Sequence, residues 1–279
     1  MKAPINRIIR HSFVDGPGNR TAIFFQGCNY HCTYCHNPET ISLCRNCGLC
    51  VGVCPAGALA MTAGRVTFAP EKCVRCDSCL KTCPHLSSPR VRWLTPGEIL
   101  AEVRKNIPFI SGITVSGGEC TLYPEFLEEL FKGAHELGLT CLIDSNGSFD
   151  FAARPQLLAV TDGVMLDVKA ADPAEYEQIT GADGSAVMAR AAYLASQGKL
   201  TEVRTVCSPD FASLMTVSTV STALAPYQQY GDIHYRIIAC RPFGVREPYR
   251  TALHYPDEAF MKQLGDAAAS CGMTHVSIV

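Results

Sequence analysis

Three cysteines close together in the chain could hold an iron–sulfur cluster. Cys28, Cys32 and Cys35 follow a C-x3-C-x2-C spacing within one short segment. Such clusters normally take four cysteine ligands, so three thiolates leave one iron open to bind a substrate or cofactor. A structural zinc site usually takes four protein ligands and often uses paired C-x2-C units. The spacing therefore favours an open [4Fe-4S] cluster over a zinc knuckle or a chance grouping.

Eight further cysteines form two runs of identical spacing, and each residue of the second run lies 29 positions after its counterpart. Each run reads C-x2-C-x2-C-x3-C and is followed by proline. This pattern is typical of bacterial two-cluster ferredoxins, in which the fourth cysteine of each run ligates the other cluster. The predicted ligand sets of two closed [4Fe-4S] clusters are Cys44, Cys47, Cys50 and Cys83, and Cys73, Cys76, Cys79 and Cys54.

The remaining five of the 16 cysteines stand alone, and we expect small buried side chains rather than ligands there. The first residues show no apolar leader, and the grouped cysteines suit ligation in a reducing cytoplasm better than disulfides. The isolated cysteines are Cys120, Cys141, Cys207, Cys240 and Cys271.

Short apolar runs alternate with helical patterns along most of the chain. Strands are predicted over 20–26, 113–115, 139–143, 163–168, 202–206, 233–239 and 275–279. Helices are predicted over 96–107, 123–137, 185–197, 213–225 and 257–271. This alternation predicts an α/β fold with a parallel sheet, built as an open or partial barrel whose chemistry lies at the carboxyl ends of its strands.

The ferredoxin-type repeat interrupts this alternation and predicts a second unit. We expect residues 1–43 and 87–279 to form the partial barrel, and residues 44–86 to form an insert with a small hairpin near 58–69. Ser87-Ser88-Pro89 marks its exit.

The composition is that of an ordinary globular protein. Of 279 residues, 47% are apolar and 18% are charged, and the net charge of −2 gives no reason to expect nucleic-acid binding. No run of 18 apolar residues occurs, so no membrane segment is expected. We expect a cytoplasmic monomer.

The segment Val14–Pro38 resembles the radical S-adenosylmethionine (SAM) superfamily. Its phrases VDGPGNR, FFQGC and CTYCHNP are similar to the glycyl radical enzyme activating enzymes, as are the later SGGE, DSNG and DVK motifs. The spacing and the insert look most like the YjjW-type activases. The resemblance implies a partial (β/α)6 radical SAM barrel with an inserted bacterial ferredoxin-like domain.

The resemblance also implies an activity. An activase of this family binds SAM at the open iron and cleaves it with one electron to a 5′-deoxyadenosyl radical. The radical then removes a hydrogen atom from a glycine of a partner glycyl radical enzyme. Three [4Fe-4S] clusters are expected, and flavodoxin or ferredoxin is the expected electron donor.

Each polar loop has an expected role in binding SAM. Gly117 and Gly118 would let backbone approach the ligand closely. Glu119 would place a carboxylate near the SAM amino group or behind it, and Arg204 could pair with the SAM carboxylate. The resemblance implies that backbone at Tyr34, Cys35 and His36 cradles the adenine. It further implies SAM contacts by Ser145, Asp167, Val168 and Lys169.

A monovalent cation, Na⁺ or K⁺, is also implied beside the SAM carboxylate. Asp144, Ser145, the carbonyl of Met165 and Asp167 match positions that surround such an ion in a related activase, and hard oxygen ligands suit it. The chain departs from the family at Arg241, which stands where many activases have a histidine.

Two other functions remain open at this point. The same cofactors could serve a radical SAM enzyme that acts on a small molecule or a short peptide. A three-cluster electron-transfer protein that does not use SAM is the other alternative, but it leaves the SGGE and DVK motifs without a purpose.

Overall fold

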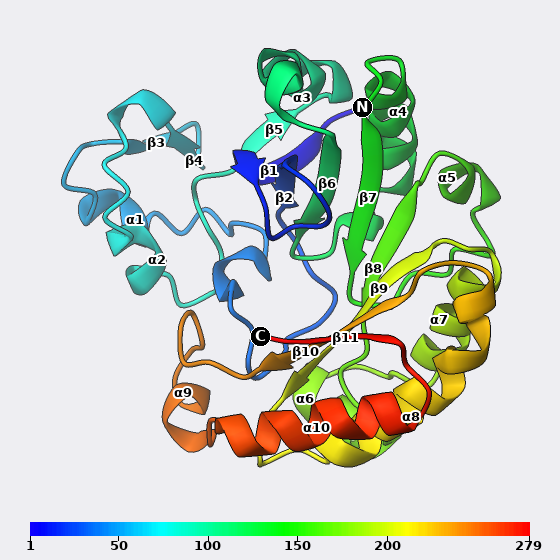
Figure 1. Ribbon diagram of the computed structural model, residues 1–279. Coiled ribbons are helices and arrows are strands. Elements are labelled where there is room, and N and C mark those ends of the chain that lie inside the picture. Colours follow the sequence, from blue (N-terminus) through cyan, green and yellow to red (C-terminus); the bar gives the residue numbers. More distant parts are fainter.

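Seven parallel strands form the centre of the computed structural model, which describes residues 1–279 (Figure 1). They pair in the order β11-β10-β9-β8-β7-β6-β2, and all six pairings are parallel. Their bounds are β2 (Arg20–Phe25), β6 (Gly112–Gly117), β7 (Thr140–Ser145), β8 (Gly163–Asp167), β9 (Leu200–Cys207), β10 (His234–Ala239) and β11 (His275–Ile278). All seven predicted strands are confirmed.

The sheet stays open because its two edge strands do not pair with each other. β1 (Ala3–Ser12) lies antiparallel to β2, and β5 (Arg92–Leu94) lies antiparallel to β1 and forms one edge. β11 forms the other edge. Both antiparallel strands were missed from the sequence. β1 mixes apolar residues with Asn6, Arg7 and Arg10, so it lacks the buried run that marks the parallel strands.

Helices connect the parallel strands and cover the outer side of the curved sheet (Figure 1). They are α3 (Pro96–Val103), α4 (Pro124–His135), α5 (Pro155–Ala159), α6 (Pro173–Thr180), α7 (Val187–Ser196), α8 (Ser213–Leu224), α9 (Tyr249–Ala252) and α10 (Glu258–Ser270). The five predicted helices are present, whereas the short α5, α6 and α9 were missed.

Local sequence signals fix several helix ends. Thr95 and Glu98 form a reciprocal capping box at the start of α3. The helix was predicted to reach residue 107, but it ends at Val103 and continues as the 3₁₀ segment η3 (Arg104–Phe109). Pro108 lacks a backbone N–H and cannot extend an α-helix. Gly138 follows α4 with a φ of 73°, as the predicted stop required.

The segment between β2 and β5 projects from the sheet and contains a hairpin and two short helices (Figure 1). β3 (Leu59–Thr62) and β4 (Arg65–Phe68) form the predicted hairpin, with α1 (Leu49–Gly52) and α2 (Ser78–Thr82) on either side of it in sequence. Its own buried cluster contains only Cys50, Leu59 and Cys79, against 47 residues in the main core. Apolar burial alone is therefore a weak source of stability for this segment.

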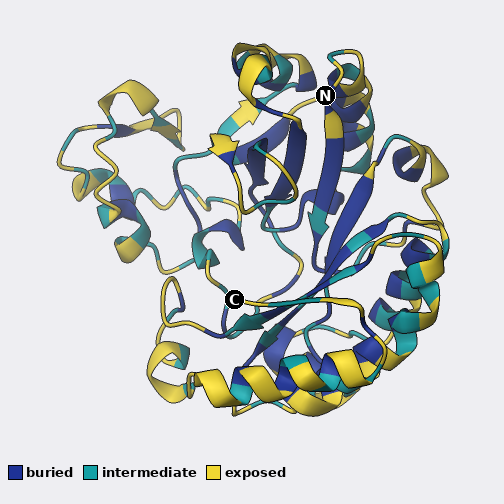
Figure 2. Ribbon diagram, viewed as in Figure 1, coloured by how far each residue is buried: buried dark blue, intermediate teal, exposed yellow.

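The main core lies between the sheet and the helices that cover it. Figure 2 shows the strands as mostly buried and the projecting segment as mostly exposed. No helix in the structure has the length and apolar character needed to cross a bilayer.

Candidate active site

The loop that follows β2 carries Cys28, Cys32 and Cys35 and is held by backbone hydrogen bonds at both ends. Cys28 N–H donates to the Ile41 carbonyl at 2.8 Å. His31 N–H donates to the Thr180 carbonyl at 2.8 Å, at the end of α6. These bonds hold the backbone of the loop that carries the three thiols.

The three thiols lie in a buried site where a thiolate without a bound cation is unfavourable. Burial is the main cause that raises the pKa of Cys28 to about 12 and that of Cys35 to about 11, and it also raises the pKa of Cys32. The neighbouring thiols add to the increase for Cys28 and Cys35. Thiolates here therefore need a bound metal to stabilise their charge.

The spacing of the sulfurs separates the two kinds of metal site. In a tetrahedral zinc site the thiolate sulfurs lie about 3.8 Å apart, given a Zn–S distance of about 2.3 Å. Only one group of three ligand-type side chains in the chain has its ligand atoms within 4.8 Å of one another, and it contains none of these cysteines. At least one pair of the three sulfurs is therefore more than 4.8 Å apart, so the loop presents no preformed tetrahedral zinc site.

The two glycines at the end of β6, Gly117 and Gly118, are required by contact between two backbones. A Cβ on Gly117 would lie 2.2 Å from the Phe25 nitrogen, and one on Gly118 would lie 2.1 Å from the Gly27 carbonyl oxygen. Gly118 N–H donates to the Phe25 carbonyl at 3.0 Å, and Glu119 N–H donates to that of Gly27 at 2.7 Å. This packing explains both glycines without a ligand, and their predicted contact with SAM stays a prediction.

The Glu119 carboxylate joins two of the predicted loops. Its side chain is buried and accepts hydrogen bonds from Thr121 N–H at 3.2 Å, Ser145 Oγ at 3.1 Å and Asn146 N–H at 2.8 Å. The Thr121 hydroxyl also donates to it. The carboxylate therefore has all these partners inside the protein, and its expected role in binding SAM stays a prediction.

Asn146 continues this chain of contacts to the cysteine loop. Its Nδ2 donates to Asn29 Oδ1 at 3.0 Å and lies 3.8 Å from Cys28 Sγ. The sequence analysis did not select Asn146 as a site residue, although the residue lies within the DSNG motif. Hydrogen bonds to cluster sulfurs are one of the factors that set a cluster's reduction potential.

The DVK motif lies beside the second cysteine of the loop, Cys32, and the Tyr34 ring. Lys169 Nζ pairs with Asp167 Oδ2 at 2.5 Å and lies 5.9 Å from the centre of the Tyr34 ring. Burial alone would lower the pKa of Lys169, but Asp167 and the nearby Tyr34 and Cys32 raise it well above its ordinary value. Lys169 is therefore a fixed positive charge at this edge of the sheet.

Two residues that were expected to contact SAM, Tyr34 and Val168, have buried side chains. The Tyr34 hydroxyl is buried without a hydrogen-bond partner, and the ring packs on Phe211 at 5.6 Å. Val168 is fully buried, so only its backbone can face a ligand. His36 is exposed, and a Cβ on Gly244 would lie 2.0 Å from its carbonyl oxygen. The segment after β10 thus packs on the end of the cysteine loop.

Arg204 already has carboxylate partners within the protein. Its Nη1 lies 3.1 Å from Asp144 Oδ1, and its Nε pairs with Glu202. Ser116 Oγ donates to the other oxygen of Asp144 at 2.9 Å. The guanidinium therefore places positive charge beside Asp144, one of the residues predicted to surround a monovalent cation. Glu202 is a partner that the sequence analysis missed.

Each predicted set of four cysteines lines one cavity of the projecting segment. One small cavity is lined by Cys44, Cys47, Cys50 and Cys83 together with seven other residues. A second small cavity is lined by Cys54, Cys73, Cys76 and Cys79, again with seven others. In both, the fourth cysteine comes from the opposite run, as the ferredoxin-type repeat predicts.

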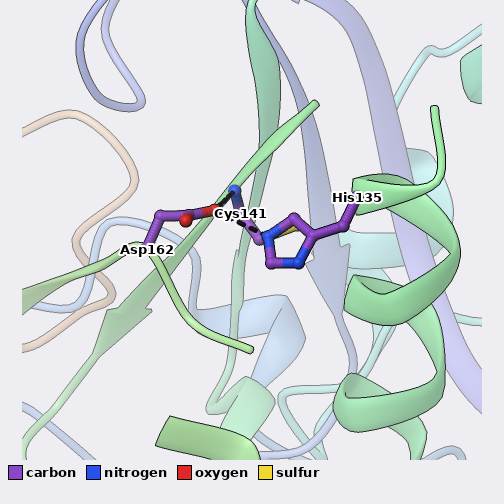
Figure 3. A group of neighbouring side chains, drawn as sticks. All are labelled: His135, Cys141 and Asp162. Atoms are coloured by element: carbon purple, nitrogen blue, oxygen red, sulfur yellow. Dashed lines mark hydrogen bonds and ion pairs between the residues drawn. The ribbon is translucent and has the colours of Figure 1, made fainter. Parts of the chain in front are cut away.

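A further group of ligand-type side chains lies at the opposite, amino-terminal edge of the strands and contains His135, Cys141 and Asp162 (Figure 3). Asp162 Oδ2 accepts hydrogen bonds from Cys141 N–H at 2.6 Å and from His135 Nε2 at 2.8 Å. Burial, and then Asp162, raise the pKa of the Cys141 thiol, which keeps it protonated at neutral pH. The group therefore links the end of α4 to the starts of β7 and β8.

The isolated cysteines are core residues, as predicted, with one exception. Cys120, Cys141, Cys207 and Cys240 are buried, whereas Cys271 is half-buried at the end of α10.

Comparison with known proteins gives the family. The profile of the radical SAM superfamily matches residues 22–209, which include the cysteine loop and the SGGE, DSNG and DVK motifs. The chain belongs to the radical SAM superfamily. Membership implies a [4Fe-4S] cluster and SAM as cofactors, and the cysteine loop is the part of this radical SAM protein that fits such a cluster.

Its relatives include activating enzymes of glycyl radical enzymes. A pyruvate formate-lyase-activating enzyme of Streptococcus mutans is 30% identical over 259 residues, which cover 84% of this chain and 82% of that protein. An indoleacetate decarboxylase activating enzyme of Tractidigestivibacter scatoligenes is 30% identical over 212 residues, which cover 67% of each chain. A Haemophilus influenzae relative, whose description also names the activation of a glycyl-radical enzyme, is 34% identical over 166 residues. That match spans 60% of this chain but only 47% of the Haemophilus protein.

Solved structures support the fold. A domain of a pyruvate-formate lyase-activating enzyme from Bacteroides vulgatus has a TM-score of 0.51 at 16% identity and covers 61% of this chain and 99% of that one. Streptococcus suis SuiB bound to S-adenosylmethionine has a TM-score of 0.59 at 11% identity and covers 90% of this chain and 48% of that one. At these identities the likeness concerns the fold alone.

Proposed function

We propose that this radical SAM protein is an activating enzyme that installs a glycyl radical on a partner glycyl radical enzyme. The observation that carries the proposal is the convergence of the loops after β2, β6, β7 and β8. Contacts through Glu119 and Asn146 tie the loops after β2, β6 and β7 together around Cys28, and Lys169 after β8 lies over the Tyr34 ring of the same cysteine loop. The Streptococcus mutans activating enzyme, which aligns over most of both chains, supports the same function.

The bound cluster and SAM supply the radical chemistry. When bound, they would supply an electron and the radical that removes a hydrogen atom from the partner's glycine, with methionine and 5′-deoxyadenosine as the products of SAM. Cys28, Cys32 and Cys35 hold the cluster in this scheme. An external reductant must supply the electron for each turnover.

The chain's own residues would position SAM against the open iron. Lys169 offers a positive charge next to the cysteine loop, with Asp167 holding its ammonium group in place. The backbone at Tyr34, Cys35, His36 and Val168 would line the adenosine part, while Gly117, Gly118 and Ser145 complete the wall. Arg204 would attract the SAM carboxylate.

A monovalent cation could share that carboxylate site. The oxygen atoms of Asp144, Asp167 and the Met165 carbonyl are the ligands we propose for Na⁺ or K⁺. Arg204 lies next to Asp144, so the ion would add to a positive charge that the chain already supplies. We infer that K⁺ tightens SAM binding modestly rather than enabling it.

The projecting segment would carry the other two clusters. We assign residues 44–86 to a ferredoxin-like insert of the YjjW-type activases and residues 1–43 and 87–279 to a partial (β/α)6 barrel. The small apolar core of the segment and its two four-cysteine cavities support this assignment. The two clusters would relay electrons from flavodoxin or ferredoxin in the cytoplasm, with the protein acting as a monomer.

The proposal is tested by anaerobic reconstitution with iron and sulfide, followed by dithionite, SAM and a candidate partner enzyme. The expected products are methionine, 5′-deoxyadenosine and an EPR doublet of a glycyl radical on the partner. SAM cleavage without a doublet on any glycyl radical enzyme of the same organism would favour a small-molecule or peptide substrate. The absence of 5′-deoxyadenosine would favour an electron-transfer protein instead.

A further inference from the structure

The projecting segment differs in charge from the rest of the chain. Residues 44–86 contain five basic side chains and two acidic ones, a net charge of +3, so the remainder carries −5 of the total of −2. The acidic Asp77 is paired with Arg90 at 2.9 Å, which leaves Glu71 as the only acidic side chain there without a basic partner. Arg45, Arg65, Lys72, Arg75 and Lys81 are all exposed and make no ion pair.

Three of these five basic residues lie close in sequence to cysteines of the second four-cysteine cavity. Lys72, Arg75 and Lys81 lie in the segment that also contributes three of the second cavity's cysteines. Lys72 and Arg75 directly precede Cys73 and Cys76 in the chain, and their side chains are exposed, so the short segment that holds these cysteines presents positive charge to solvent. The first cavity has one basic residue in its lining, Arg45, and Lys81 lies two residues from its Cys83.

The lining of the second cavity also includes an apolar side chain and a cysteine that are both exposed to solvent. Val74 lines the second cavity and yet is 65% exposed, so it forms a thin wall between the cavity and water. Cys76 lines the cavity and is exposed as well. A short apolar contact ringed by charge is suited to a brief encounter in which an electron crosses and the partners separate.

We propose that the surface formed by Lys72, Val74, Arg75 and Lys81 is the docking site of a small acidic one-electron carrier protein. This inference rests on the proposed function, because it requires a cluster in the second cavity. It adds the point of entry: the electron enters at the cluster held by Cys54, Cys73, Cys76 and Cys79. Positive charge around the entry point attracts an acidic carrier, whereas it would repel a basic one.

The test compares two reductants on one holoenzyme. A flavodoxin with an acidic surface, kept reduced, serves as the protein donor, and dithionite serves as the small donor that needs no docking site. The variant is Lys72→Glu/Arg75→Glu. The control is Arg104→Glu/Lys105→Glu, which makes the same change of charge at two exposed, unpaired residues of η3. Iron content and absorption spectra establish that each variant holds its clusters.

The expected result is a selective loss. Flavodoxin-driven formation of 5′-deoxyadenosine falls about tenfold or more in the Lys72→Glu/Arg75→Glu protein at low salt, and less than about twofold in the control. The dithionite-driven rate stays the same in both. Raising the ionic strength slows the wild-type reaction with flavodoxin and has little effect on that of the variant. If the double variant loses iron, the neutral pair Lys72→Gln/Arg75→Gln and the single variant Lys81→Glu take its place.

Other results would overturn the proposal. Equal flavodoxin-driven rates in the variant and the control would place the donor elsewhere. A loss of glycyl radical on the partner with dithionite as reductant, at an unchanged rate of SAM cleavage, would assign the surface to the glycyl radical enzyme. A failure of SAM cleavage in wild-type protein with dithionite would instead refute the proposed function, which keeps the two failures distinguishable.

Discussion

Substituting alanine for Gly118 should remove the catalytic cluster while leaving the clusters of the insert in place. The added Cβ would lie 2.1 Å from the Gly27 carbonyl oxygen, about 1.3 Å closer than the 3.4 Å at which ordinary contact begins. It would also lie 2.6 Å from the Gly27 carbonyl carbon and 2.9 Å from the Thr40 oxygen. All three are backbone atoms, so no side-chain rotation relieves the overlap.

The displaced residue comes directly before the first cluster ligand. Moving Gly27 by about 1 Å disturbs its N–H bond to Thr40 at 2.8 Å and that of Cys28 to Ile41 at 2.8 Å. Overpacking typically costs about 1–3 kcal/mol, and each weakened hydrogen bond adds about 0.5–1.5 kcal/mol. We expect the free energy of unfolding to fall by about 2–4 kcal/mol and the bound iron to fall by about a third, one cluster of three.

The assay is iron content and EPR of the reconstituted protein in the absence of SAM, together with thermal unfolding. Gly97→Ala is the matched control, because a Cβ there meets nothing within 4 Å and Gly97 lies within α3. It should keep all its iron and gain up to about 1 kcal/mol of stability. Full iron content and an unchanged melting temperature in Gly118→Ala would refute the reasoning. Full iron with weaker SAM binding would show that the glycine serves the ligand instead.

Three further predictions concern the same site. Asn146→Leu removes an N–H donor that lies 3.8 Å from Cys28 Sγ, so the potential of the catalytic cluster should fall in an EPR-monitored redox titration, whereas those of the insert clusters should not move. Cys32→Ala should abolish dithionite-driven SAM cleavage and Cys76→Ala should spare it; equal loss in both would contradict the separation of roles. Asp167→Asn leaves Lys169 buried without its partner and should lower the free energy of unfolding by about 3–5 kcal/mol. The pKa of Lys169 is raised in the folded protein, so the stabilisation from this pair is fully present below pH 10.5 and is lost as the pH rises toward the folded pKa. Chemical denaturation near pH 11 should therefore show a smaller effect of Asp167→Asn on the free energy of unfolding.

The sequence predicts the parallel strands well because their signal is local. Strands such as β2, with all six residues buried, appear as continuous apolar runs between turn residues. The cysteine sets were also predicted from the sequence, because the spacing of each run is that of two-cluster ferredoxins, in which the fourth cysteine ligates the other cluster. The structure groups the same cysteines around its two cavities.

Contacts between residues far apart in the sequence could not be predicted from local sequence patterns. Arg20 at the start of β2 is buried and donates to the carbonyls of Ile113 at 2.7 Å and Thr140 at 2.9 Å, across two neighbouring strands. Nothing in its local sequence indicates this role. The engagement of Glu119 with Ser145 and Asn146 likewise depends on the register of β6 beside β7.

The role of the two glycines in the SGGE motif could be predicted only in part from the sequence. Their residue type correctly indicates a close approach, but the sequence cannot say what is approached. In the structure the partner is the backbone of β2 and Gly27, which lies next to the cluster loop. The motif therefore positions Cys28 through packing, whether or not it also touches SAM.

The most direct test of the central claim follows one hydrogen atom. The partner enzyme is prepared with glycine deuterated at its α-carbon and incubated anaerobically with the reconstituted protein, SAM and dithionite. The account predicts a glycyl radical doublet by EPR and 5′-deoxyadenosine that contains one deuterium by mass spectrometry. Deuterium-free 5′-deoxyadenosine with no doublet, across all glycyl radical enzymes of the organism, would contradict the assignment of this protein as an activating enzyme.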